Sequence, residues 1–295
     1  MTLTRPRSIA EMRRVDRAFV SDESRRRGLG YQPRPDDIFI SPYAKCGTTW
    51  MQQIVHGLRS AGSMEFDEIT QAVPWLELAY DMGWDVNADQ VAHPRAFKSH
   101  LRWNEIPKGG RYIVVMRDPT DAMLSLYRFL DGWRFASGAI SLTEFAEYYL
   151  TRAETNCYWQ HAASWWAERG RGDVLLLSFE GMKADLPDTV ARVAGFMGLS
   201  GASGHIGVAT QQADFAFMKR HADQFDDHLL RAARDGPCGL PADGTATKVD
   251  RGVAGHGRTE ASPKIRAAFD RRWQEVMTAR FGLDSYDELR RELGH

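Results

Sequence analysis

Residues 37–55 read Asp37-Ile-Phe-Ile-Ser-Pro-Tyr-Ala-Lys-Cys-Gly-Thr-Thr-Trp-Met-Gln-Gln-Ile-Val55. The apolar run at 38–40 predicts a short buried strand, Pro42 and Gly47 predict a turn, and apolar residues then recur at helical spacing. A strand, a tight turn and a helix start form a cradle for phosphate, because the first N–H groups of a helix lack partners and the helix dipole favours an anion. Lys45 adds a positive charge. The alternative is an ordinary strand–helix turn with an exposed lysine, which the spacing alone does not exclude.

The bulk composition is that of an ordinary globular protein. The chain has 295 residues, of which 43% are hydrophobic and 26% charged, with a formal net charge of −1. Because there is no basic field, nucleic-acid binding is not expected, and an anionic ligand must be held by local cations. No apolar run is long enough to cross a bilayer, and the N-terminus lacks the apolar core of a signal peptide. The odd, sparse set Cys46, Cys157 and Cys238 favours a reducing, cytoplasmic location without a disulfide framework.

Hydrophobic patterning divides the rest of the chain into strands and helices. Residues 1–36 are expected to form a helix near 8–20 and an irregular lead-in without chemistry, and residues 37–295 to form a single domain. The predicted strands lie at 38–40, 95–101, 113–116 and 174–179, and the predicted helices follow the cradle, follow Asp118, occur twice within 141–170, span 187–197 and begin again at Ser262. The segment 235–248 is a loop by composition, and it is interpreted as part of a mobile lid at about 235–258.

The order of residues in the cradle separates it from the common nucleotide-binding loop. A Walker loop places its lysine between a glycine and Ser or Thr, whereas Lys45 precedes Cys-Gly-Thr-Thr-Trp. This order resembles the 5′-phosphosulfate loop of cytosolic-type sulfotransferases, which usually reads Tyr-Pro-Lys-Ser-Gly-Thr-Thr-Trp; Ala44 stands for the proline and Cys46 for the serine. The resemblance implies a P-loop-like α/β fold with a central parallel sheet flanked by helices. It also implies 3′-phosphoadenosine 5′-phosphosulfate (PAPS) as the sulfuryl donor, with PAP as its product.

A second motif ends in two candidate catalytic side chains, Lys98 and His100. The run Arg95-Ala-Phe-Lys-Ser-His-Leu101 is strand-like, and strand ends in an α/β sheet face a ligand crevice. A lone histidine is usually structural or solvent-facing, but near neutral pH it can also serve as a base. The run resembles the Lys-Thr-His-Leu motif of the sulfotransferases, in which the histidine is the base, and departs from it at Arg102, where the family commonly has proline.

A third motif pairs Arg117 with Ser125. Arg117 follows the apolar run 113–116, and Ser125 lies two helical turns further on, in a helix that Asp118 can cap. The spacing resembles that of the family's Arg and Ser, which hold the 3′-phosphate of the nucleotide; a guanidinium suits that task because it donates two hydrogen bonds in a planar fork. The alternatives are an ion pair of Arg117 at the helix terminus and an inert helical serine.

Further segments resemble the family's adenine-binding and C-terminal motifs. Phe179-Glu-Gly-Met-Lys resembles Tyr-Glu-Asp-Met-Lys without the tyrosine hydroxyl, and Phe215 falls where the family has an adenine-stacking aromatic. Residues 249–258 resemble Arg-Lys-Gly-x-x-Gly-Asp-Trp-Lys, in which Arg251 and Gly252 fit. In this segment Asp250 replaces an arginine, which places a negative charge where a phosphate is expected.

The resemblance, which runs from about residue 37 to 281, implies the following roles. His100 is the general base, Lys45 neutralises charge on the leaving phosphate oxygen, and Lys98 assists at the sulfuryl oxygens. Expected at the nucleotide are Lys45, Cys46, Gly47, Thr48, Thr49, Trp50, Arg117, Ser125, Phe179, Phe215, Arg251 and Gly252. Expected at a small, apolar or aromatic hydroxyl acceptor are Trp75, His100 and Trp103.

Two other classes of function remain open. A nucleotide kinase with an atypical phosphate loop would need Mg²⁺ and a carboxylate to hold it. A PAP-binding protein without catalysis is favoured by Asp250, Ala213 and Phe179, which depart from the family pattern. The sequence shows no Cys/His/carboxylate cluster with metal-ligand spacing, so no metal is expected. It leaves the acceptor and the oligomeric state undetermined.

Overall fold

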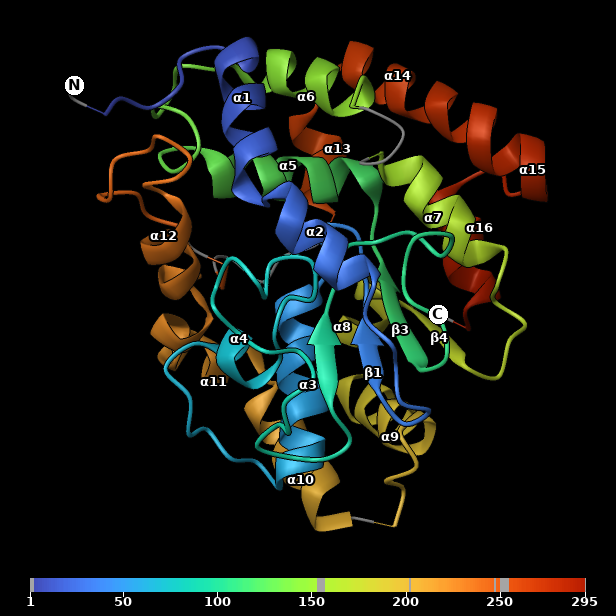
Figure 1. The fold of residues 1–295 in the computed structure, drawn as a ribbon. Coiled ribbons are helices and arrows are strands. Elements are labelled where there is room, and N and C mark those ends of the chain that lie inside the picture. The colour runs from blue at the N-terminus through green and yellow to red at the C-terminus, as the bar shows by residue number, and fades with distance from the viewer. Residues whose placement is uncertain (1–2, 153–156, 202, 247, 250–254, 295) are drawn as a thin grey trace.

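A four-stranded parallel sheet forms the centre of the molecule (Figure 1). The computed structural model describes residues 3–152, 157–201, 203–246, 248–249 and 255–294. The strands are β1 (Ile38–Ile40), β2 (Ala96–Lys98), β3 (Arg111–Met116) and β4 (Val174–Ser178), in the order β2-β1-β3-β4. Ile40 lies opposite Lys98 on one side and Ile113 on the other. Because all four strands are parallel, the segments that follow them emerge at one edge of the sheet.

Alternating strand residues divide the interior into two cores, one on each face of the sheet. Ile38 and Ile40 point into one core, whereas Phe39 points into the other. The first core is covered by α3 (Thr48–Ser60), α9 (Leu186–Phe196) and α10 (Ser203–Gln212). The second is covered by α5 (Pro119–Leu130), α6 (Leu142–Leu150), α7 (Tyr158–Trp166) and α14 (Pro263–Trp273).

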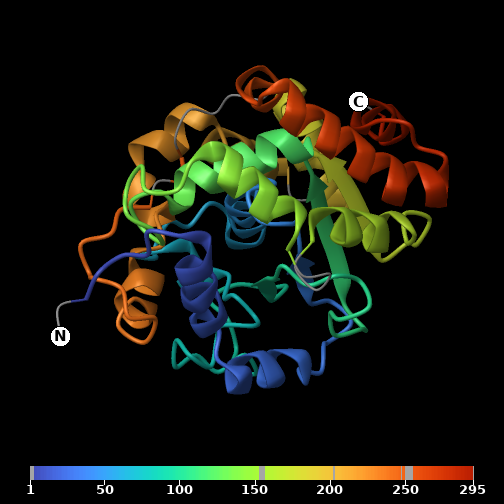
Figure 2. The ribbon, with the colours of Figure 1, turned by 90° about the horizontal axis from the view of Figure 1, so that it is seen from above.

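Shorter elements complete the two layers. They are α1 (Ile9–Phe19), α2 (Asp22–Leu29), α4 (Ile69–Ala72), α8 (Phe179–Ala184), α11 (Phe215–Arg220), η2 (Ala222–Phe225), α12 (His228–Arg234), α13 (His256–Glu260), η3 (Gln274–Thr278), α15 (Ala279–Phe281) and α16 (Tyr286–Glu292). Helix α1 contributes Met12, Val15 and Phe19 to the second core. Figure 2 shows it in dark blue, to the left of the centre of the view. The N-terminal segment is therefore packed into the same core as the rest, and is more than the lead-in that its sequence suggested.

The predicted α/β fold with a central parallel sheet is confirmed, and its elements lie close to the predicted positions. The strand predicted at 95–101 is shorter and ends at Lys98. The Ser99 N–H still donates to the Ile40 carbonyl at 2.8 Å, whereas the His100 N–H donates to the Glu77 carboxylate. Helix α2 was not predicted; it begins at a Ser21 N-cap within an arginine-rich segment that has little apolar patterning. The described residues of the loop at 235–248 contain no helix or strand. In the described part of the chain, no helix combines the length and apolar character that crossing a bilayer requires.

Candidate active site

The cradle places an open helix N-terminus at the end of β1. Lys45 and Gly47 adopt positive φ angles of 64° and 96°, and Gly47 caps α3 without any side-chain hydrogen bond to the first turn. A side chain at Gly47 would be strained in this conformation, and its Cβ would lie 3.1 Å from the Phe179 ring. The hydroxyl of Thr48 is buried and has no hydrogen-bond partner among the described residues. An unpartnered hydroxyl beside uncapped N–H groups suits an anion.

Two lysines face this site with aromatic rings, rather than carboxylates, directly beneath them. The Lys45 Nζ lies 4.0 Å from the centre of the Phe129 ring, and the Lys98 Nζ lies 4.0 Å from that of Trp75. The pKa of Lys45 is lowered to about 7 and the pKa of Lys98 to about 8. The larger cause is burial of each ammonium group, and the second is repulsion by the positive charge of Lys248. An anion bound between them would favour their charged forms.

A buried ion pair between Asp227 and Lys248 borders the two lysines. Asp227 is 3% exposed, has a φ of 63°, and accepts a hydrogen bond from the Lys248 ammonium. Burial acts to raise the pKa of Asp227, but Lys248, Lys98 and Lys45 together hold it below its usual range. Neither residue of the pair was predicted, because each lies outside the recognised motifs. Their signal appears only when the fold brings segments 227 and 248 together.

His100 is held in one tautomer by its contacts. Its Nδ1 lies 2.7 Å from the carbonyl oxygen of Pro42, which can only accept, so Nδ1 carries the proton and Nε2 keeps a free lone pair. The backbone N–H of His100 donates to Glu77 at 2.9 Å, and its ring lies edge-on to Trp75 at 5.1 Å. Burial and the adjacent Lys98 lower the pKa of His100 to about 3. The ring is therefore neutral at neutral pH and has the form that a general base requires.

Arg117 lies at the end of β3 and Ser125 lies on α5, and both face the same cavity. The Arg117 guanidinium donates to the Lys45 carbonyl at 3.1 Å, lies 4.3 Å from the centre of the Phe179 ring, and is 3.8 Å from Asp121. The ion pair considered from the sequence is thus present, but it is long and leaves Arg117 facing the cavity.

Asp121 also anchors the glycine-rich C-terminal loop. Its two carboxylate oxygens accept from the backbone N–H groups of Gly255 at 2.6 Å and Gly257 at 2.5 Å. A Cβ at Gly257 would lie 2.5 Å from the Asp121 nitrogen, so only glycine allows this approach. Gly257 therefore packs tightly against the start of α5.

Three aromatic side chains line the next part of the cavity. The Trp50 indole donates to the Ala213 carbonyl at 2.8 Å, and its ring meets that of Phe179 edge-on at 5.4 Å. Phe215 lines the same wall and is 44% exposed. A planar nucleobase could pack between these aromatic rings, because they form an apolar slot.

One cavity of about 1100 Å³ contains most of the predicted site residues. Those that line it are Lys45, Gly47, Thr48, Thr49, Trp50, Trp75, Lys98, His100, Arg117, Ser125, Phe179 and Phe215. Cys46 does not line it, since its side chain is fully buried in the second core, and only its backbone remains available. Trp103 does not line it either: its indole packs edge-on against Tyr112 and Trp165 in the second core. The structure therefore places the side chains of these two predicted site residues outside the cavity.

Comparison with known proteins gives the same family that the sequence motifs resemble. A family model described as a sulfotransferase domain matches residues 35–281. Sulfotransferase 2A1 of Macaca fascicularis is 26% identical over 257 residues, covering 83% of this chain and 85% of that protein. Sulfotransferase 1E1 of Cavia porcellus is 24% identical over 262 residues, covering 84% and 85%. The chain belongs to the sulfotransferase family. The family prediction is confirmed, and with it the class of enzyme, a PAPS-dependent sulfotransferase.

Solved structures share the fold of this sulfotransferase. Retinol dehydratase in complex with androsterone and the inactive cofactor PAP superposes with a TM-score of 0.73 at 18% identity, covering 96% of this chain and 98% of that one. Mouse sulfotransferase SULT7A1 complexed with PAP gives 0.69 at 21% identity, covering 94% of each chain. At these identities the likeness establishes the fold.

The predicted nucleotide-binding residues Arg251 and Gly252, together with Asp250, lie outside the described residues of the sulfotransferase. Their roles stay predictions.

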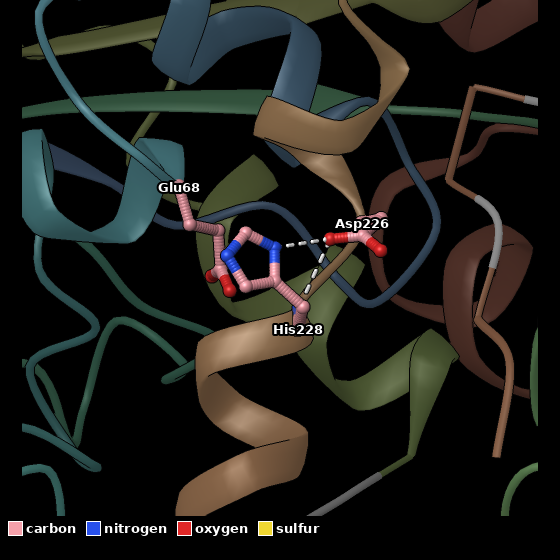
Figure 3. Close-up of side chains that lie close together, drawn as sticks. All are labelled: Glu68, Asp226 and His228. Carbon is pink, nitrogen blue, oxygen red and sulfur yellow. Dashed lines mark hydrogen bonds and ion pairs between the residues drawn. The ribbon is translucent and has the colours of Figure 1, made fainter. Parts of the chain in front are cut away.

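One cluster in the described part of the chain has the geometry of a metal site, and it lies outside the cavity (Figure 3). Single ligand atoms of Glu68, Asp226 and His228 lie within 4.8 Å of one another. Asp226 accepts from the Nδ1 of His228 at 2.7 Å and from its backbone N–H at 3.0 Å, while Glu68 accepts from the Leu229 N–H at 2.7 Å. These hydrogen bonds fix the start of α12 and so orient the neighbouring Asp227. The cluster is accounted for as a structural anchor.

Proposed function

We propose that this sulfotransferase transfers a sulfuryl group from PAPS to a hydroxyl of a small-molecule acceptor, with His100 as the general base. The observation that carries the proposal is that one cavity holds both the Nε2 of His100, with its proton fixed on Nδ1, and the open cradle with Lys45. A proton acceptor and an anion site that share one cavity suit transfer of an anionic group to an alcohol.

The nucleotide fits the residues that are present. Uncapped N–H groups at the start of α3, the unpartnered Thr48 hydroxyl and Thr49 would hold the 5′-phosphate. Arg117 and Ser125 would hold the 3′-phosphate, which distinguishes PAP from adenosine 5′-phosphate. Adenine would occupy the slot between Trp50, Phe179 and Phe215. The PAP complexes of structurally similar proteins support this assignment.

The reaction requires charge neutralisation and a single proton transfer. PAPS supplies an activated sulfuryl group: its sulfur–oxygen bond to the phosphate breaks as a bond to the acceptor oxygen forms. His100 takes the hydroxyl proton onto Nε2 while the Pro42 carbonyl holds the other ring nitrogen. Lys45 faces the cradle and neutralises charge on the departing phosphate oxygen, and Lys98 neutralises the sulfuryl oxygens. Lys248 adds a third cation, whose position Asp227 fixes.

The body of the acceptor would pack on the aromatic wall around Trp75. Complexes of retinol dehydratase with androsterone and with retinol support a small-molecule acceptor. The cytoplasmic location and the single-domain organisation stay predictions.

A sulfuryl-transfer assay tests the proposal. The protein is incubated with PAPS carrying a labelled sulfuryl group and a panel of phenols and alcohols, and PAP and adenosine 5′-phosphate binding are measured by calorimetry. Transfer to at least one hydroxyl compound is expected, with no requirement for Mg²⁺. PAP binding without transfer to any acceptor would support the non-catalytic alternative, and Mg²⁺-dependent use of ATP would support the kinase.

A further inference from the structure

Among the residues that the structure describes, the cavity of the sulfotransferase contains one buried arginine whose guanidinium has no polar partner. Arg134, just after α5, is 4% exposed, lines the cavity, and has no hydrogen bond or ion pair to its side chain within the described part of the chain. Its guanidinium instead lies over two aromatic rings, 3.7 Å from the centre of Phe19 and 4.4 Å from that of Trp133.

Two other buried arginines, Arg95 and Arg59, each have several polar partners. Arg95, which is 2% exposed, forms a two-pronged ion pair with Asp37, with N···O distances of 3.0 and 2.9 Å. Arg59 donates to three carbonyl oxygens and to the Gln90 side chain. A buried charge without such partners is costly, and cation–π contacts compensate only in part. Arg134 therefore has the environment of a residue that a ligand completes.

An aromatic wall connects Arg134 to the proposed base. The Phe19 ring beneath Arg134 lies 5.9 Å from the Trp75 ring, and the Trp75 ring lies 5.1 Å from that of His100. A compound with an apolar body could thus lie along Phe19 and Trp75, with its hydroxyl at His100 and its other end at Arg134. The four residues come from four segments that are well separated in the sequence.

Resting on the proposed function, we infer that the acceptor is a hydroxy acid: an alcohol or phenol whose carboxylate is bound by Arg134. A planar guanidinium matches a carboxylate through paired hydrogen bonds, and the low polarity of the wall strengthens this contact. Asp16 of α1 also lines the cavity. Its carboxylate accepts a hydrogen bond from the Tyr148 hydroxyl at 2.8 Å and forms no ion pair with Arg134.

The test compares matched acids and esters. Calorimetry measures binding of 4-hydroxyphenyl-acetate, -propanoate and -butanoate, and of their methyl esters, to the full chain with and without PAP. At least one acid is expected to bind about 10- to 100-fold more tightly than its ester, as one charge-assisted contact implies. Arg134→Met should abolish this ratio and Arg134→Lys should restore part of it. The ratio should persist in Arg13→Met, because Arg13 also lies over an aromatic ring, 5.3 Å from the centre of Tyr148, but is outside the cavity.

The outcomes separate this inference from the proposed function. Failure of PAP to bind, or of any acceptor to receive sulfuryl, counts against the proposed reaction, whereas the acid-to-ester ratio decides the role of Arg134. Esters that bind as tightly as acids across the whole series would overturn the inference even if Arg134→Met does not fold. A ratio that survives in folded Arg134→Met would overturn it as well.

Discussion

The proposed nucleotide end and the proposed acceptor end of the cavity are built in different ways. The nucleotide end centres on six consecutive residues, 45–50, at the edge of a parallel sheet, and it includes the uncapped backbone N–H groups at the start of α3. The acceptor end is assembled from side chains of Phe19, Trp75 and Arg134, which are remote in sequence and meet only by packing. A site made from consecutive residues requires a particular local sequence, whereas a site made from distant side chains requires no local sequence pattern.

The largest expected effect tests whether His100 belongs to the chemistry or to the packing. His100 and His161 are both buried and both have a pKa lowered to about 3, chiefly by burial, but His161 does not line the cavity. His100→Ala should slow single-turnover transfer by about 10²- to 10⁴-fold, while PAP affinity stays close to that of the wild type.

His161→Gln is the matched control. It should lower the melting temperature and leave the rate of transfer within a few-fold of the wild type. The assignment would be wrong if His100→Ala folded normally and transferred sulfuryl at a near wild-type rate.

A smaller effect is expected for recognition of the 3′-phosphate at the nucleotide end. PAP should bind at least about tenfold more tightly than adenosine 5′-phosphate, since each charged hydrogen bond contributes roughly 1.5–3 kcal/mol. Arg117→Ala should remove most of that preference, as measured by calorimetry with both nucleotides. Equal affinities of the wild type for the two nucleotides would contradict the role of Arg117 and Ser125.

The third effect is a pH dependence of PAP affinity that comes from Lys45 and Lys98, between the two ends of the cavity. Below pH 7 both Lys45 and Lys98 carry a proton in the ligand-free protein; above pH 8 both are mostly neutral, because their pKa values are lowered to about 7 and about 8. Binding of anionic PAP favours the charged forms, so binding takes up protons and weakens as pH rises from 7 to 9. The limit is about tenfold per pH unit for each lysine.

Calorimetry in buffers of different ionisation enthalpy measures this proton uptake directly. Lys45→Met should bind PAP more weakly at pH 7 and lose the part of the pH dependence that is centred near pH 7. Affinity independent of pH across this range would show that the two ammonium groups do not face the anion.

The smallest effect concerns Cys46, which the sequence placed at the nucleotide. Because its side chain is buried away from the cavity, Cys46→Ala should change PAP affinity by less than about twofold, since the backbone of the cradle is retained. A modest loss in melting temperature is expected from the smaller side chain. A loss of PAP affinity comparable to that of Lys45→Met would show that the thiol contacts the nucleotide after all.

The same division explains which residues the sequence could predict. Lys45, His100 and Arg117 follow strands, and strand ends in a parallel sheet converge at one edge, so their proximity follows from local patterns. Phe19 and Arg134 carry no local signal, because a helix and a turn position them only through long-range packing. Asp227 and Lys248 were not predicted from the sequence for the same reason.

Trp103 shows the converse error. It follows the His100 motif closely in sequence, but the chain changes direction after Leu101. The backbone N–H of Trp103 donates to the hydroxyl of Ser164 on α7 at 3.2 Å, and its indole packs in the second core. Closeness in sequence to His100, the proposed base, therefore predicted a place in the cavity that the change in chain direction removes.

The position of α1 has a consequence for how such an enzyme can diverge. This helix reaches the cavity from the first twenty residues and brings Asp16 and Phe19 to the acceptor wall, while the cradle, Arg117 and Ser125 come from other elements. A substitution on that face of α1 alters the acceptor wall without touching the groups assigned to the donor nucleotide. Gene duplicates could thus exchange one acceptor for another through changes near the N-terminus, under selection that leaves the use of the donor intact.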